Sequence, residues 1–223
     1  MIVILIIILC IILFLYIVSK MEICRYLHCI QNKNLSTYVE KFNNTNKCKN
    51  GYKNIISINV KPSEIKNLGK VINSLLDQTI KCNLITIVVP KEYDVSIPMK
   101  LKNVVVQFPC GNNFGELNCI IPTILREGKN KTNIIVVSCD RIWGRDYIET
   151  LLRESDKYPN HIISTNTNKP TLRDGCLFRI DNFDLDFIKN MKSNIHNEDY
   201  IKNYLKNIPV KKIMYTKNYK LLL

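Results

Sequence analysis

Residues 133–152 read NIIVVSCDRIWGRDYIETLL, and this stretch decides the fold class of the chain. Four β-branched residues lead into a short polar patch that runs from Ser138 to Arg141. The apolar positions after the patch recur at helical spacing. In α/β proteins the chemistry usually lies where a buried strand ends and a helix follows. The stretch therefore predicts a buried strand, a helix and a candidate site between them.

The rest of the chain continues this alternation of strand-like and helix-like segments. Strands are expected at residues 54–60, 83–89, 103–108, 133–137, 161–165, 176–180 and 210–215. Helices are expected from Pro62 onward, at 116–126, from Tyr147 to Leu152, at 184–192 and at 198–206. Several strands are continuously apolar, which is typical of a parallel sheet with helices on both faces. We therefore expect an α/β fold.

The N-terminus carries a separate apolar segment. Residues 2–18 contain no charge and, as a helix, would span about 25 Å, enough for a thin bilayer. A cleaved signal peptide is the alternative, but its apolar region is shorter and ends in small residues, which Tyr16 to Ser19 do not supply. We expect an uncleaved single-pass anchor at 1–19, a stalk at 20–53 and one domain at 54–223. Two basic residues after the anchor, Lys20 and Arg25, leave the side of the membrane open.

The net charge of +13 admits two interpretations. It can attract phosphate-bearing ligands or anionic lipid headgroups, or it can be the solvated surface of a lysine-rich chain. The basic residues are spread along the chain without arginine clusters, so no nucleic-acid partner is expected. Nine cysteines without a CxxC pair argue against a disulfide framework or a zinc site.

Two common nucleotide sites are excluded by the positions of glycine. A dinucleotide-binding fold needs a glycine-rich turn after its first strand, and residues 59–64 contain none. A Walker A loop needs paired glycines and a Gly-Lys-Ser/Thr ending, which residues 128–132 lack. The sheet must therefore carry another ligand.

Five segments, in order and at fitting spacing, suggest which ligand that is. They read PSEIKNLGKVINSLLDQT (62–79), FGELNCIIPTIL (114–125), IIVVSCDRIWGRDYIETLL (134–152), DGCLFRIDNFDLDFI (174–188) and NEDYIKNYLKNIPVKKI (197–213). Together they resemble the nucleotide-sugar glycosyltransferases of the GT-A fold over roughly residues 55–215. The resemblance implies a GT-A-like, Rossmann-like, mostly parallel sheet flanked by helices and preceded by one transmembrane helix. It also implies sugar transfer, preferably inverting, from a nucleotide-sugar to an unknown glycan, protein or lipid acceptor.

The family's Asp-x-Asp motif is reduced here to Ser138-Cys139-Asp140. In the family these acids hold Mn²⁺ or Mg²⁺ against the donor diphosphate. The resemblance places Ser138, Asp140, Arg141 and Lys61 at the donor, with Asp140 as the remaining metal ligand. Three interpretations stay open. Asp140 binds the metal alone, Arg141 supplies the positive charge without a metal, or the site has lost catalysis and only binds.

The resemblance also assigns the general base that an inverting transfer needs. That role falls to the Glu198-Asp199 pair, with Asp199 preferred. The alternative is structural, because two acids in the first turn of a helix are stabilised by its dipole. Two basic positions of the family are Glu64 and Cys119 here. The sequence thus predicts a membrane-anchored glycosyltransferase, with a catalytically inactive GT-A-like interaction module as the alternative.

Overall fold

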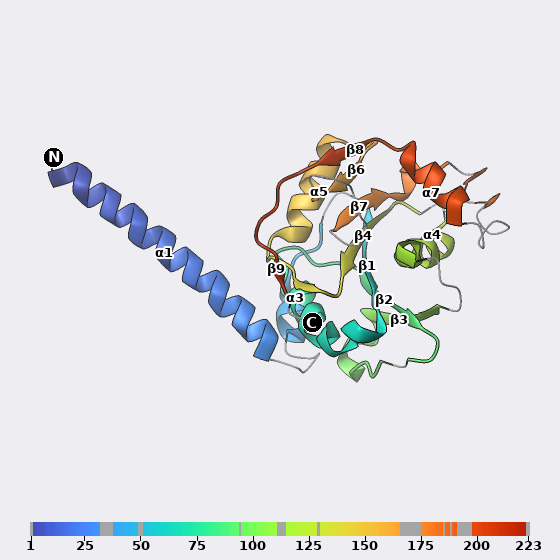
Figure 1. Ribbon diagram of the computed structural model, residues 1–223, viewed down its shortest axis with the longest axis horizontal. Coiled ribbons are helices and arrows are strands. Elements are labelled where there is room, and N and C mark those ends of the chain that lie inside the picture. The colour runs from blue at the N-terminus through green and yellow to red at the C-terminus, as the bar shows by residue number, and fades with distance from the viewer. Residues whose placement is uncertain are drawn as a thin grey trace.

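A seven-stranded sheet forms the centre of the molecule (Figure 1). The computed structural model describes residues 2–31, 38–48, 51–93, 95–110, 115–128, 130–165, 175–184, 186–187, 189–190 and 198–221. The strands of the sheet are β1 (Lys53–Asn59), β2 (Leu84–Pro90), β3 (Val105–Cys110), β4 (Thr132–Ser138), β6 (Ile162–Ser164), β7 (Cys176–Arg179) and β8 (Val210–Lys212).

The strand order is β3-β2-β1-β4-β7-β6-β8. Strands β3, β2, β1 and β4 pair in parallel, β7 is antiparallel to both β4 and β6, and β8 is parallel to β6. Every residue of β4 is buried, as expected of a strand covered on both faces. The predicted α/β class and mostly parallel sheet are confirmed.

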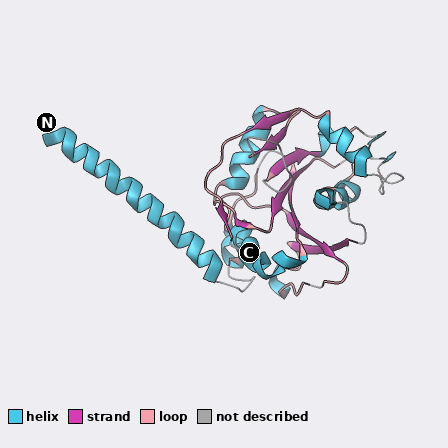
Figure 2. Ribbon diagram, in the orientation of Figure 1, coloured by secondary structure: helices cyan, strands magenta, loops and turns pink. Residues whose placement is uncertain are grey.

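Helices cover both faces of the sheet (Figure 2). Their bounds are α1 (Ile2–Gln31), α2 (Val39–Asn44), α3 (Leu68–Leu76), α4 (Ile121–Glu127), α5 (Tyr147–Lys157) and α7 (Glu198–Lys206). One apolar core joins α2, α3, α5 and the end of α1 to alternate strand residues such as Ile56 and Val137. The other joins α4 and α7 to the intervening residues, such as Ile134 and Val136. The period of two along the strands thus divides the core between the faces.

The helical regions expected from Pro62 and at 116–126 begin as 3₁₀ helix and not as α-helix. Short 3₁₀ segments, Pro62–Asn67 and Gly115–Cys119, precede α3 and α4. Each of the two helical regions has a proline in its first turn, where its missing N–H is no loss. The strand expected at 210–215 ends at Lys212, and the chain then leaves the sheet. The helix expected at 184–192 lies partly outside the described residues.

Helix α1 is the one described helix long and apolar enough to cross a membrane. Its side chains from Val3 to Ile17 are exposed, each by about half or more of its surface. Apolar surface of this extent needs a partner outside the chain, and lipid supplies one. The helix is consistent with a signal anchor or a signal sequence.

The segment expected to be a stalk packs against the domain over its described residues. Arg25 of α1 donates from Nε to Asp77 Oδ2 at 2.7 Å and from Nη1 to the Trp143 carbonyl at 3.0 Å. Cys29 of α1 and Phe42 of α2 are fully or almost fully buried in the core. These contacts join residues far apart in the sequence, so local composition did not reveal them. The long helix therefore enters the domain and forms part of its core.

Gly175, just before β7, tests the packing around the candidate site. Its φ is +92°, and a Cβ there would lie 2.9 Å from Cζ3 of Trp143 and closer still to the Tyr147 hydroxyl. We expect Gly175→Ala to lower the free energy of unfolding by about 3 kcal/mol, from backbone strain and overpacking together. Gly51→Ala is the matched control, because Gly51 has a φ of +75° and no neighbour within 4 Å. It should cost only the backbone strain, about 1 kcal/mol. Equal losses on denaturant unfolding in detergent would contradict the packing argument.

Candidate functional site

The candidate site lies at the carboxyl edge of the two central strands. Strands β1 and β4 pair in parallel, with Asn59 opposite Ser138. Lys61 lies two residues after Asn59, and Asp140 lies two residues after Ser138. Both residues therefore lie just beyond the same edge of the sheet. Adjacent strands lie about 4.8 Å apart. The structure therefore places Lys61 at the same edge of the sheet as Ser138, Asp140 and Arg141.

The Asp140 carboxylate is held from two sides. The Ser138 hydroxyl donates to its Oδ1. Arg141 donates from Nε to Oδ1 at 2.8 Å and from Nη2 to Oδ2 at 3.2 Å. This forked geometry is the strong form of an arginine–carboxylate pair. The Asp140 side chain is only 10% exposed, so the pairing offsets the cost of burying its charge.

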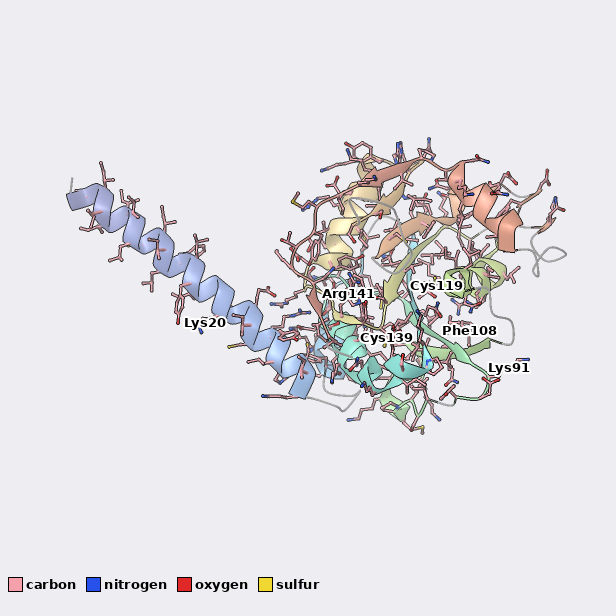
Figure 3. All side chains as sticks on the ribbon, viewed as in Figure 1. Lys20, Lys91, Phe108, Cys119, Cys139 and Arg141 are labelled. Carbon is pink, nitrogen blue, oxygen red and sulfur yellow. The ribbon has the colours of Figure 1, made fainter. Side chains whose placement is uncertain are left out.

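Arg141 reaches the surface from this pair, with 19% of its side chain exposed. Its guanidinium carbon lies 5.5 Å from the centre of the Trp143 ring. Trp143 is itself fully buried, and its indole N–H donates to the Ser138 carbonyl at 3.2 Å. In Figure 3, Arg141 lies on the side of the domain nearest α1, and Cys119 lies toward α4. Trp143 thus supports the patch from within the core.

The described residues do not fit a divalent cation at this patch. Both oxygens of Asp140 accept hydrogen bonds from Arg141, whose positive charge repels a metal ion. Nowhere in the described part of the chain do three His, Cys, Asp or Glu side chains gather as a metal-binding group. A hard cation such as Mn²⁺ or Mg²⁺ needs several oxygen ligands. The positive charges at this edge of the sheet are those of Arg141 and Lys61.

Glu64 and Cys119, which the resemblance aligns with basic residues, are both buried. Glu64 is 2% exposed, and its Oε2 accepts the Lys61 backbone N–H at 3.3 Å, which caps the 3₁₀ segment. Cys119 is buried in the core on the α4 face. Cys139, between the two motif residues, is also buried, and burial raises the pKa of its thiol. None of these three side chains offers a positive charge to a phosphate group.

The C-terminal strap, residues 213–221, closes the loop that follows β4, and the sequence did not predict it. Strand β9 (Tyr219–Lys220) pairs antiparallel with β5 (Arg141–Ile142). The Leu221 N–H donates to the Asp140 carbonyl at 2.7 Å, and the Gly144 N–H donates to Asn218 Oδ1 at 3.0 Å. Two-residue strands carry no periodic signal, so only the folded chain shows this pairing. The strap fixes the backbone on which Asp140 and Arg141 stand.

Asp146 ties the middle of the strap to the same loop. It accepts the Tyr215 hydroxyl at 2.6 Å and the Lys217 ammonium at 2.7 Å. Burial raises the pKa of the Asp146 carboxyl, but these hydrogen bonds outweigh it and hold the pKa below its ordinary value. The ionised form therefore stabilises the attachment of the strap.

Glu198 and Asp199 begin α7, as the sequence predicted for a helix at 198–206. Their side chains lie outside the described residues. Helix α7 packs through Ile201 on the core face that it shares with α4. The role of Asp199 as general base, with Glu198 beside it, therefore stays a prediction.

A cavity of about 370 Å³ lies elsewhere in the described part of the chain. Asp181, Asn182, Tyr204 and Pro209 are among its lining residues. The antiparallel pairing of Arg179 with Asn133 places the end of β7 beside the start of β4. The cavity is therefore at the amino edge of the parallel strands, opposite the Asp140 patch, and it does not form part of the candidate site.

The sequence matches no family model and no curated protein. The assignment of a function therefore rests on the residues and on their geometry.

The lowered pKa of Asp146 predicts a pH-dependent contribution to stability. Because the pKa is lower in the folded state, the stabilisation is present above the ordinary pKa of about 4 and is lost as the pH falls through the folded value. At pH 7 we expect Asp146→Asn to lower the free energy of unfolding by about 1 kcal/mol, and the difference from wild type should shrink in acid. Asp186→Asn, at a side chain that is 85% exposed, is the control and should change nothing. An Asp146→Asn effect of equal size at pH 7 and pH 3, measured by denaturant unfolding, would contradict this account.

Proposed function

We propose that this protein is a membrane-anchored GT-A-like glycosyltransferase domain whose donor site works without a divalent cation. The fold supports the proposal because a mostly parallel sheet carries the reduced motif at its carboxyl edge. The single observation that carries it is the forked pair between Asp140 and Arg141 at that edge. The five sequence segments supply the link to nucleotide-sugar chemistry.

The chemistry requires positive charge at the leaving group. When the bond between a sugar and a nucleoside diphosphate breaks, negative charge develops on the phosphate oxygens. A guanidinium stays charged at all relevant pH values and presents its N–H donors in a planar fork that suits phosphate. Asp140 orients this guanidinium, and Lys61, exposed at the end of the neighbouring strand, adds a second positive charge. Arg141 and Lys61 would thus take the part that a metal ion takes in the family.

The membrane anchor belongs to the same proposal. Helix α1 continues without a break through residues 16–19, the place where a signal peptidase would have to cut. Its last turns are held in the domain by Arg25 and Cys29. Cleavage there would interrupt a helix whose end is part of the core. These features support an uncleaved anchor.

A second candidate function is a catalytically inactive interaction module with the same fold. It is favoured by a specific observation: Glu64 and Cys119, at the two basic positions of the family, are both buried. A domain with that loss would keep its fold and its anchor but would bind the donor weakly or not at all. The two candidates differ in whether a nucleotide binds.

Nucleotide binding to the full-length protein in detergent separates them. We expect UDP or GDP to raise the melting temperature in EDTA as much as in Mn²⁺, since a ligand held by the native state stabilises it. At a concentration of about 100 times Kd the gain is about 2.7 kcal/mol. Arg141→Ala should abolish the shift, while Arg153→Ala, at a side chain that is 62% exposed on α5, should leave it intact. A shift seen only with Mn²⁺ would support a metal at Asp140, and no shift with any nucleotide would support the inactive module.

The assignment of the general base has its own test. In a donor screen over common nucleotide-sugars, we expect Asp199→Asn to reduce transfer by about 100-fold or more, because an amide cannot take the acceptor proton as the preferred base would. The nucleotide-induced rise in melting temperature should be unchanged. Glu198→Gln is the matched control and should retain most of the turnover. Turnover like that of wild type in Asp199→Asn would remove Asp199 from the role.

A further inference from the structure

We infer that a basic surface beside the base of α1 contacts the anionic lipid headgroups of the membrane that α1 crosses. This basic surface consists of Lys211 of β8 and Met214 and Lys217 of the C-terminal strap. The inference rests on the proposed membrane anchor, but it does not depend on glycosyl transfer. It specifies which face of the domain lies against the bilayer.

The first step is that α1 cannot swing freely relative to the domain. Arg25 follows Lys20, the first charge after the apolar segment, by five residues, which is about 7.5 Å along the helix. Besides Asp77 and the Trp143 carbonyl, the guanidinium contacts the Ser74 carbonyl at 3.3 Å. Only 10% of the Arg25 side chain is exposed. A continuous helix that is fixed in this way sets both the height and the tilt of the domain above the bilayer.

The second step is that the strap passes next to this part of α1. The peptide between Trp143 and Gly144 links the two segments: Arg25 donates to the Trp143 carbonyl at 3.0 Å, and a Cβ on Gly144 would lie 2.9 Å from Cζ of Tyr215. In Figure 1 the strap, drawn in dark red between β8 and β9, runs along the edge of the domain that faces back along α1. The strap is therefore held near the level at which the helix leaves the apolar layer.

The third step is the chemistry of the side chains there. Met214 is 82% exposed, although it stands next to the half-buried Tyr215. Lys217 has 52% of its side chain exposed while pairing with Asp146, and the Lys211 ammonium lies 4.4 Å from the centre of the Tyr158 ring. Lysines place their apolar stems on a surface and their charges in the headgroup layer. Each lysine near an anionic leaflet contributes about 1 kcal/mol.

The position of Met214 distinguishes it from the other exposed apolar side chains. Outside α1, the exposed large apolar side chains in the described part of the chain are Tyr93, Met99 and Met214. Of these, Met214 adjoins Tyr215, which packs against Gly144 next to the Trp143 carbonyl that Arg25 contacts. A flexible thioether flanked by lysines suits the boundary between headgroups and acyl chains. The same strap holds the Asp140 carbonyl through Leu221, so the membrane contact bears directly on the candidate site.

Tryptophan fluorescence in nanodiscs tests the inference on the full-length chain. The protein has one tryptophan, Trp143, which is fully buried and gives a constant background. Met214→Trp is reconstituted into discs that contain phosphatidylserine and a phosphatidylcholine brominated close to its headgroup. Met99→Trp is the matched control, since Met99 is 79% exposed and lies in another part of the domain, in the 3₁₀ segment Met99–Leu101.

We expect the bromines to quench the added fluorescence of Met214→Trp at least twofold and to leave that of Met99→Trp unchanged. Lys211→Gln, or discs without phosphatidylserine, should at least halve the quenching. Equal signals from the two tryptophan variants, or quenching that is the same in neutral and anionic discs, would overturn the inference. If the protein does not enter the discs, the membrane anchor fails, and the lipid contact fails with it. If the protein enters the discs but Met214→Trp is not quenched, only the lipid contact fails.

Discussion

The parallel, in-register pairing of β1 with β4 is the constraint on which the rest of this structure depends. It sets Asn59 opposite Ser138, so the two loops that follow leave the sheet side by side. Both strands are buried on both faces, so a shift of one residue would turn apolar side chains out of both cores. The register is therefore strongly specified. It brings Lys61 to the same edge as Asp140 and Arg141.

The charge balance at that edge follows from burial. A carboxylate that is 10% exposed must be paired, and its charged partner is on the next residue, Arg141. The pair is thus a stable arrangement that needs no metal ion. The buried carboxylate of Glu64 also needs a partner, and it finds one in the backbone, because it caps the 3₁₀ segment after β1. Each acid in this region has a structural partner within the chain.

Asp77 is another buried carboxylate that is paired within the chain. It is almost completely buried and receives both Arg25 of α1 and Lys41 of α2. Removal of one partner from such a buried group typically costs 3–5 kcal/mol. Helix α1, the loop after β4 and the C-terminal strap meet around these contacts. A change in the tilt of α1 would therefore act on the backbone at Asp140.

Much of the fold was predictable from local patterns. The buried strand at 133–137 and the amphipathic segment after Tyr147 are visible in the sequence, because burial imposes the period of two or 3.6 on the apolar residues. The predicted strand at 210–215 was too long, because pairing between distant segments and not propensity ends β8 at Lys212. The residues proposed for the site, Lys61, Ser138, Asp140 and Arg141, could be placed at one edge of the sheet, because each follows a strand that could be recognised.

The sequence by itself determined the α/β class, the apolar N-terminal helix and the edge of the sheet that carries the polar patch. Only the tertiary structure decided that Arg141 closes on Asp140, that α1 docks through Arg25, and that the strap pairs with Arg141 and Ile142. The physical reason is range. Hydrophobic periodicity depends on residues that are close in the sequence. The partner of a buried charge depends on which groups folding brings near it, and these can be far away in the sequence.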